Sequence, residues 1–269
     1  MTSFPRRAEL GDAQLAFNYR YFVRLAAAFG GRVLDYGCGE GQTVALGRAQ
    51  GLDIWGADTY TGMFADWINS LEPNIRDRIR KIESGRTDYP DDHFDLVISN
   101  QVLEHVTSPE AVIADICRMM KPGGCFIAAF PVTETWYEGH VGLYFGHRFK
   151  PDAATRRIYF DLSHRLGFGL YRHGKTRAEW LKMVETMLDE SCFYYPYQRL
   201  MSAIEKTFGE PIEDIAVDYM RTRLGSRARY IPTAADPLLR FIYHKRAGEI
   251  IRVGKSTRGS SSDLKLSGN

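Results

Sequence analysis

Apolar residues follow two different spacings along the first 130 residues of the chain. Short apolar runs typical of buried strands occur at residues 32–35, 53–58, 79–83, 94–99 and 125–130. Helices are predicted at residues 12–29, 43–50, 63–70 and 109–120, and a turn at residues 121–124. Since strands that alternate with helices build parallel βαβ units, the pattern predicts an α/β, Rossmann-like fold with a doubly wound, mostly parallel seven-stranded sheet.

The second half of the chain departs from this rhythm. Residues 131–190 are rich in aromatic residues and arginine and hold four of the seven histidines, so we expect them to form a cap inserted after the fifth strand of the core, residues 1–130. A helix at 197–209 and a strand at 248–253 are expected within a C-terminal part, residues 191–253, that completes the sheet. The tail, residues 254–269, is rich in Gly, Ser and Lys and is predicted to be disordered.

Composition and charge exclude several classes of protein. The formal net charge of +2 gives no basic field for nucleic acid, so no nucleic-acid partner is expected. No apolar run approaches about 18 residues, so no transmembrane segment is expected, and the first residues lack the apolar region of a secretory signal. Cysteines stand at positions 38, 117, 125 and 192, without a CxxC pair or zinc spacing. We therefore expect a cytoplasmic protein with reduced thiols and no metal site; the sequence leaves the oligomeric state open.

A glycine-rich turn follows the first strand at residues 35–41. Gly37, Gly39 and Gly41 permit positive φ angles and let a ligand touch the backbone, and the helix that follows offers free N–H groups. The G-x-G-x-G spacing differs from the G-x-G-x-x-G of dinucleotide-binding folds. Asp35 at the strand end would repel a pyrophosphate, but it tolerates a ligand that carries an ammonium or a sulfonium.

A second acid ends the second strand. Asp58 stands 23 residues after Asp35, and a carboxylate at that place can accept hydrogen bonds from both hydroxyls of a ribose. A helix cap for the following segment is the alternative. The glycine turn upstream favours the ribose.

These segments resemble the motifs of class I S-adenosylmethionine (SAM)-dependent methyltransferases, in the small-molecule branch that includes ubiquinone-biosynthesis-like enzymes (methyltransferase type 11). Residues 33–41 resemble the first motif, residues 94–106 the fourth-strand region and residues 121–124 the turn before the fifth strand. The resemblance covers about residues 15–130.

The resemblance implies SAM as the cofactor. It implies that the methionine part lies at the glycine turn, the ribose on Asp58, and the floor beneath the sulfonium on Asn100 and Gln101. The adenine contact stays open, because relatives carry an acid just after the position of Gly85, where this chain has Arg86, Thr87 and Asp88. The predicted cofactor-binding residues are Asp35, Gly37, Cys38, Gly39, Gly41, Asp58, Asn100 and Gln101.

Three histidines are candidate general bases. A base is needed only when the acceptor still holds its proton. His140 is the first candidate, because it lies between small residues in the aromatic segment 136–149, which follows the fifth strand and borders the ligand crevice. His105, beside Glu104 after the fourth strand, is the second, with a structural helix-capping role as the alternative. Within the aromatic segment 136–149, His147 is a further possible base, and Arg148 could meet an anionic group.

The leading function is therefore a SAM-dependent methyltransferase that acts on a small-molecule or lipid- or saccharide-linked acceptor by in-line displacement. A non-catalytic SAM-fold binding or assembly protein is the alternative from another class. A nicotinamide oxidoreductase is a third, disfavoured by the glycine spacing and by Asn100.

Overall fold

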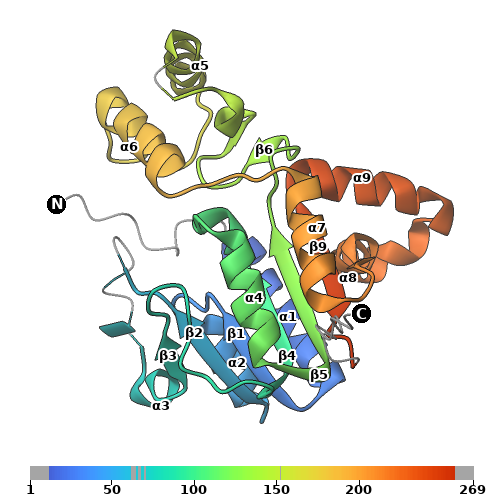
Figure 1. Cartoon of the computed structure of the whole chain (residues 1–269). Helices are drawn as coiled ribbons and strands as arrows, with labels where there is room; N and C mark the ends of the chain where they lie inside the picture. Colours follow the sequence, from blue (N-terminus) through green and yellow to red (C-terminus); the bar gives the residue numbers. More distant parts are fainter. Residues whose placement is uncertain (1–11, 62–64, 66–67, 70, 152, 258–269) are drawn as a thin grey trace, which may run out of the picture.

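A seven-stranded sheet forms the centre of the protein in the computed structural model, which describes residues 12–61, 65, 68–69, 71–151 and 153–257 (Figure 1). The strand order is β3-β2-β1-β4-β5-β9-β8. The strands are β1 (Arg32–Tyr36), β2 (Asp53–Asp58), β3 (Ile79–Lys81), β4 (Phe94–Asn100), β5 (Met120–Phe130), β8 (Glu213–Asp214) and β9 (Glu249–Gly254). This sheet confirms the predicted Rossmann-like fold.

The first five strands are parallel, and only β9 runs against its neighbours, β5 and β8. Asp35 of β1 pairs with Gly56 of β2 and Ile98 of β4. Because the carboxyl ends of parallel strands share one edge, this register gathers the ends of β1, β2 and β4 in one place, where ligands of such folds bind.

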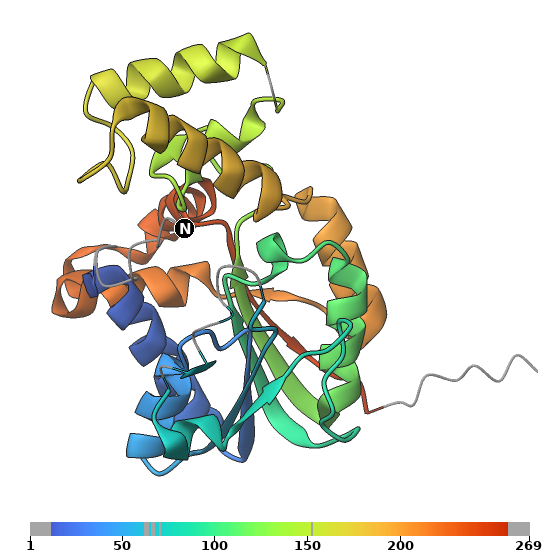
Figure 2. The same cartoon turned by 90° about the vertical axis from the view of Figure 1, so that its left-hand side faces the viewer.

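Helices cover both faces of the sheet (Figures 1 and 2). One face packs on α4 (Pro109–Met119) and α7 (Tyr197–Phe208), with Phe94, Phe126 and Phe208 in its core. The other packs on α1 (Asp12–Phe29), α2 (Gln42–Ala49), α8 (Ala216–Leu224) and α9 (Asp236–Arg246). The short helical turns are α3 (Pro73–Arg76), η3 (Leu103–His105), η4 (Gly146–Arg148), η5 (Gly225–Tyr230) and η6 (Thr233–Ala235). None of the helices described is long and apolar enough to span a bilayer.

The chain between β5 and α7 builds a cap with its own small core. It contains the hairpin β6 (Tyr137–Glu138) and β7 (Leu143–Tyr144), then α5 (Ala154–Arg165) and α6 (Arg177–Glu190). The side chain of Trp180 is fully buried there against Val141 and Phe160. Figure 1 shows α5 and α6 beyond the carboxyl end of β5, on the side where the parallel strands end.

Two predicted segments differ from the structure, and a third, the helix at 63–70, lies largely outside the described residues. The predicted turn at 121–124 is instead part of β5. Phe94 pairs with Met120 and Leu96 pairs with Cys125, so residues 121–124 form a bulge in the pairing between β4 and β5. The predicted disordered tail begins too early, because Gly254 ends β9 and the Lys255 N–H donates to Gly124 O at 2.8 Å. The rest of that tail, from residue 258, lies outside the described residues.

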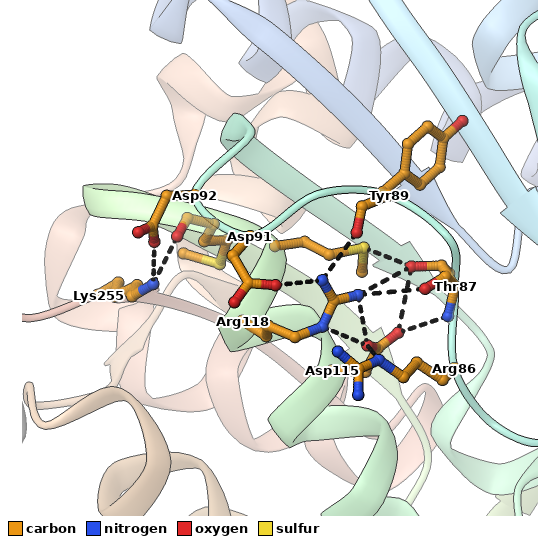
Figure 3. Close-up of polar contacts among 10 residues, drawn as sticks. Arg86, Thr87, Tyr89, Asp91, Asp92, Asp115, Arg118 and Lys255 are labelled. Atoms are coloured by element: carbon orange, nitrogen blue, oxygen red, sulfur yellow. Dashed lines mark hydrogen bonds and ion pairs between the residues drawn. The ribbon is translucent and has the colours of Figure 1, made fainter.

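A buried ion pair ties the loop after β3 to α4 (Figure 3). Arg118 donates from Nε and Nη2 to Asp115 Oδ1 at 2.9 and 2.8 Å, and from Nη1 to Tyr89 O and Asp91 Oδ1, both at 2.7 Å. The Thr87 N–H donates to the second oxygen of Asp115 at 3.0 Å. The side chain of Asp115 is only 5% exposed, so its charge depends on these donors.

We expect Arg118→Met to lower the free energy of unfolding by about 3 kcal/mol, because it leaves the Asp115 carboxylate buried without its cation. Urea unfolding measures this. The matched control is Arg86→Met: that side chain is 68% exposed and lies 4.0 Å from the same carboxylate, so the loss should stay below about 1 kcal/mol. Equal losses in the two variants would contradict the role of Arg118.

Candidate functional site

The glycine turn between β1 and α2 is held by backbone hydrogen bonds, both to β2 and within the turn. The N–H groups of Gly37 and Cys38 both donate to Ala57 O, at 2.7 and 3.1 Å, and Gly41 N–H donates to Cys38 O at 2.9 Å. Gly37, Gly39 and Gly41 all have positive φ. A Cβ atom at Gly37 would lie 2.1 Å from Val102 Cγ2, so only glycine lets the turn approach the end of β4 so closely.

The side chain of Cys38 faces away from the turn. Its side chain is buried, and its Sγ lies 3.6 Å from the hydroxyl of Tyr60. Burial raises the pKa of the Cys38 thiol, so it stays protonated. The sulfur packs beneath the turn against Gly56. A ligand in the turn would therefore meet the backbone of Cys38 and not its side chain.

Asp58 connects the end of β2 to the glycine turn. Its Oδ2 accepts a hydrogen bond from Gly39 N–H at 2.8 Å, and its Oδ1 accepts one from Tyr60 N–H at 3.3 Å. The Tyr60 hydroxyl donates to Gly39 O at 3.0 Å. Each carboxylate oxygen keeps lone-pair capacity for a further donor, so Asp58 can still accept ribose hydroxyls.

The end of β4 carries two unusual polar residues. The side-chain Oδ1 of Asn100 is buried and has no hydrogen-bond partner among the described residues. Gln101 has a φ of 58°, which a non-glycine residue rarely adopts, and its N–H donates to Ala129 O at 2.7 Å. An unmatched amide oxygen and a strained backbone at a strand end are features that functional sites retain.

These groups fit the predicted cofactor. Asp35, only 3% exposed, is the penultimate residue of β1, and Gly41 is the N-cap residue of α2, which has no side-chain cap. A ligand with a cationic centre, a carboxylate and a ribose can therefore meet Asp35, the start of α2 and Asp58, respectively.

The structure brings the two predicted catalytic histidines together. His105 Nε2 lies 3.1 Å from His140 Nε2. On the far side of each ring, His105 Nδ1 lies 2.5 Å from Ser191 O, and His140 Nδ1 lies 2.7 Å from Glu138 Oε1. His105 belongs to η3, five residues beyond the end of β4, so the pair lies between the core and the cap.

These contacts determine the protonation of the pair. A carbonyl and a carboxylate only accept hydrogen bonds, so both Nδ1 atoms must donate. When both rings are neutral, the two Nε2 lone pairs then face each other. The pair therefore has a strong affinity for one shared proton.

Glu138 supports this arrangement from a fully buried position. Its Oε1 accepts hydrogen bonds from the ring and the N–H of His140 and from the Tyr194 hydroxyl, and its Oε2 accepts from Val141 N–H at 2.7 Å. Burial alone would raise the pKa of Glu138, but these donors lower it to about 2. Burial alone would lower the pKa of His140, but the Glu138 carboxylate raises it well above its usual range.

The other residues singled out from the sequence lie apart from this pair. His147 packs on Tyr194 with ring centroids 4.5 Å apart and the ring planes tilted by 39°, and burial lowers the pKa of His147. Arg148 is exposed and lies over the Phe145 ring, so it does not line the pair. Asp88 is exposed on the loop after β3.

Sequence reasoning gave no role to three residues of this cluster: Glu138, Cys192 and Tyr194. The Glu138-x-His140 spacing was the one available signal. His105, His140 and Cys192 place their ligand atoms within 4.8 Å of one another, so they could also hold a metal ion.

Comparisons with known proteins find similarity to methyltransferases. Residues 13–163 match a methyltransferase domain family. The chain is 33% identical over 113 residues to the ubiquinone biosynthesis O-methyltransferase of Photorhabdus laumondii, covering 41% of this chain and 46% of the relative. It is 27% identical over 132 residues to the enzyme of that name from Yersinia pestis, covering 48% and 54%. The chain thus spans about half the length of these curated relatives.

The fold also occurs in a solved structure, that of an S-adenosylmethionine-dependent methyltransferase from Mesorhizobium loti. The TM-score is 0.51 at 15% identity, with 88% of this chain and 97% of the other covered. At this identity the likeness concerns the fold.

We expect Asp58→Asn to weaken SAM binding about tenfold or more, because the ribose loses charge-assisted hydrogen bonds. Isothermal titration measures the affinity, and the melting temperature checks that the turn stays folded. Asp53→Asn is the control, because Asp53 begins the same strand and pairs with Arg32 at the opposite end. Unchanged affinity in a folded Asp58→Asn variant would exclude the ribose role.

Proposed function

The chain belongs to the methyltransferase domain family, and on this premise we propose that it transfers the methyl group of SAM to a hydroxyl oxygen of a small-molecule or lipid- or saccharide-linked acceptor. The family match confirms two predictions from the sequence, the class of enzyme and SAM as its cofactor. The acceptor and the catalytic residues belong to the proposal.

The cofactor is held by the ends of β1, β2 and β4. Asp58 accepts the ribose hydroxyls, and the glycine turn leaves room for the methionine part. Asn100 and Gln101 form the floor beneath the sulfonium. The buried, unmatched oxygen of Asn100 supports this arrangement, because the negative end of its amide dipole stabilises a positive sulfur placed above it.

The acceptor lies between this edge and the cap. When bound, SAM supplies a methyl group that is already activated by its positive sulfur. The protein mainly has to align the acceptor oxygen with that carbon, which can supply about 7–11 kcal/mol of the barrier. As the new oxygen–carbon bond forms and the carbon–sulfur bond breaks, the acceptor must lose its hydroxyl proton.

The histidine pair receives this proton. The observation that carries the proposal is the 3.1 Å approach of His105 Nε2 and His140 Nε2, with both Nδ1 atoms committed as donors. A proton that enters between the two rings is stabilised by both lone pairs and by the Glu138 carboxylate behind His140. The printed names of the curated relatives, which are O-methyltransferases, agree with a hydroxyl acceptor.

Mass spectrometry of extracts incubated with isotopically labelled SAM tests the activity and identifies the acceptor. A new labelled methyl ether is the expected product. Binding of SAM without any labelled product would overturn the proposal in favour of a non-catalytic binding or assembly protein.

We expect His140→Ala and His105→Ala each to lower turnover about 100-fold while SAM affinity stays unchanged, because the proton loses its acceptor. Label transfer to the identified acceptor measures turnover. His173→Ala, an exposed histidine of the cap, is the control and should retain full turnover. Full turnover in both pair variants would exclude a histidine base. Loss of wild-type turnover on treatment with a chelator would point to a metal ion on His105, His140 and Cys192 instead.

Turnover should rise with pH through a midpoint above about 6.5, the usual pKa of histidine. The pair acts only after losing its shared proton, and Glu138 raises the pKa of His140. In Glu138→Gln the midpoint should move to lower pH, because a neutral amide stabilises the protonated pair less. A pH profile at saturating SAM measures both midpoints, with the surface variant Glu185→Gln as control. Identical midpoints in wild type and Glu138→Gln would contradict this electrostatic link.

A further inference from the structure

A small cavity in the cap adjoins the histidine pair. Its volume is about 170 Å³. Cys192 and Tyr194 line one part of it, and the Tyr194 hydroxyl lies 3.2 Å from His140 Nδ1. Arg156 of α5, His147 and Asp189 line it as well. The cavity therefore lies in the cap, with Tyr194 and Cys192 between it and the histidine pair.

Arg156 is the unusual residue of this cavity. It is only 3% exposed, although arginine is almost never fully buried unless it is paired. Its Nη1 donates to Asp189 Oδ1 at 2.6 Å. Its Nε and Nη2 are buried and have no hydrogen-bond partner among the described residues.

The two unmatched nitrogens are the pair that binds carboxylates. Nε–H and one Nη2–H lie side by side on one edge of the guanidinium plane, and this fork matches the two oxygens of a carboxylate. The Asp189 contact at Nη1 and the Phe160 ring, 5.3 Å from Cζ, fix the plane of the group. Arg156 is thus held in one plane with Nε and Nη2 unpaired. Both atoms have almost no accessible surface, so a carboxylate reaches them only when the wall of the cavity shifts.

The charges around the cavity favour a single negative charge over a phosphate dianion. Asp189 already balances part of the charge of Arg156. His147 lies nearby with its Nδ1 buried and without a partner among the described residues, and its Nε2 lies 3.4 Å from Thr133 O. A carbonyl only accepts, so a neutral His147 has its proton on Nε2 and adds no positive charge.

We propose that this cavity is a carboxylate subsite, in which Arg156 binds the acceptor's carboxylate through Nε and Nη2. This inference rests on the proposed function in one respect, that the cavity belongs to the acceptor site. The acceptor is then a hydroxy acid, with its carboxylate on Arg156 and the hydroxyl to be methylated near the histidine pair. The bulk of a lipid- or saccharide-linked acceptor has to lie outside so small a cavity.

The test uses acetate as a minimal carboxylate and acetamide as its neutral counterpart. Titration of the ¹⁵N-labelled full chain, at constant ionic strength, follows the Arg156 Nε–H resonance. Acetate should shift it saturably and acetamide should not. Binding of acetate should weaken about tenfold or more in Arg156→Gln and also in Arg156→Lys, which keeps the charge but loses the fork.

Arg157→Gln is the matched control. Arg157 is the next residue of α5, its side chain is 75% exposed, and its Nε lies 3.5 Å from Glu185, so acetate binding should change less than about twofold. If wild-type Arg156 gives no saturable shift with acetate, the subsite is refuted without reference to any variant. Equal affinities in Arg157→Gln and Arg156→Lys would refute it too.

A second measurement separates the subsite from the proposed function. Acetate should inhibit label transfer competitively with the acceptor. Saturable binding without competition would place the carboxylate site outside the acceptor site and overturn the hydroxy-acid assignment. Absence of any methyl transfer, with acetate binding intact, would remove the proposed function and leave only an anion site.

Discussion

The burial of the Glu138 carboxylate is the interaction on which the site between core and cap depends. A carboxylate removed from water is costly unless donors replace the solvent. Here they come from the chain just after β6 and from Tyr194 beyond α6, so one ionised group joins the two ends of the cap. The same group fixes the ring of His140, and with it the distance to His105. The position of the cap and the distance between the two histidine rings therefore both depend on the Glu138 carboxylate.

The core could be predicted from the sequence because its signals are local. Continuous apolar runs mark β1, β2, β4 and β5, and the glycine turn with Asp58 lies where two of these strands end. The start of β5 could not be predicted, because residues 121–124 have the composition of a turn. Only the distant Lys255, whose backbone bonds Gly123 and Gly124, shows that they stay beside the sheet.

The cap helices α5 and α6 could not be predicted from the sequence, for a different reason. On α5 the apolar residues Ile158 and Leu162 are 67% and 53% exposed, and its C-cap residue Leu166 is 63% exposed, whereas Arg156 is buried. The pattern of apolar residues therefore does not show which face of α5 is packed. The arrangement of the site could not be predicted from the sequence pattern either. Each histidine was recognisable alone, but their approach, and the parts of Glu138, Cys192 and Tyr194, depend on contacts across dozens of residues. Such contacts leave no periodic trace in a sequence.

The antiparallel strand β9 has a consequence for the order in which the molecule is assembled. β9 lies between β5 and β8, and it pairs with β5 from Cys125–Gly254 to Phe130–Glu249. During synthesis the ribosome completes β5 and the whole cap before residues 249–254 exist. Until then the apolar β5 is an open edge, a template for pairing with other chains. The nascent protein therefore passes through a stage in which β5 is an exposed edge strand, and this edge is covered only by β9, the last strand described.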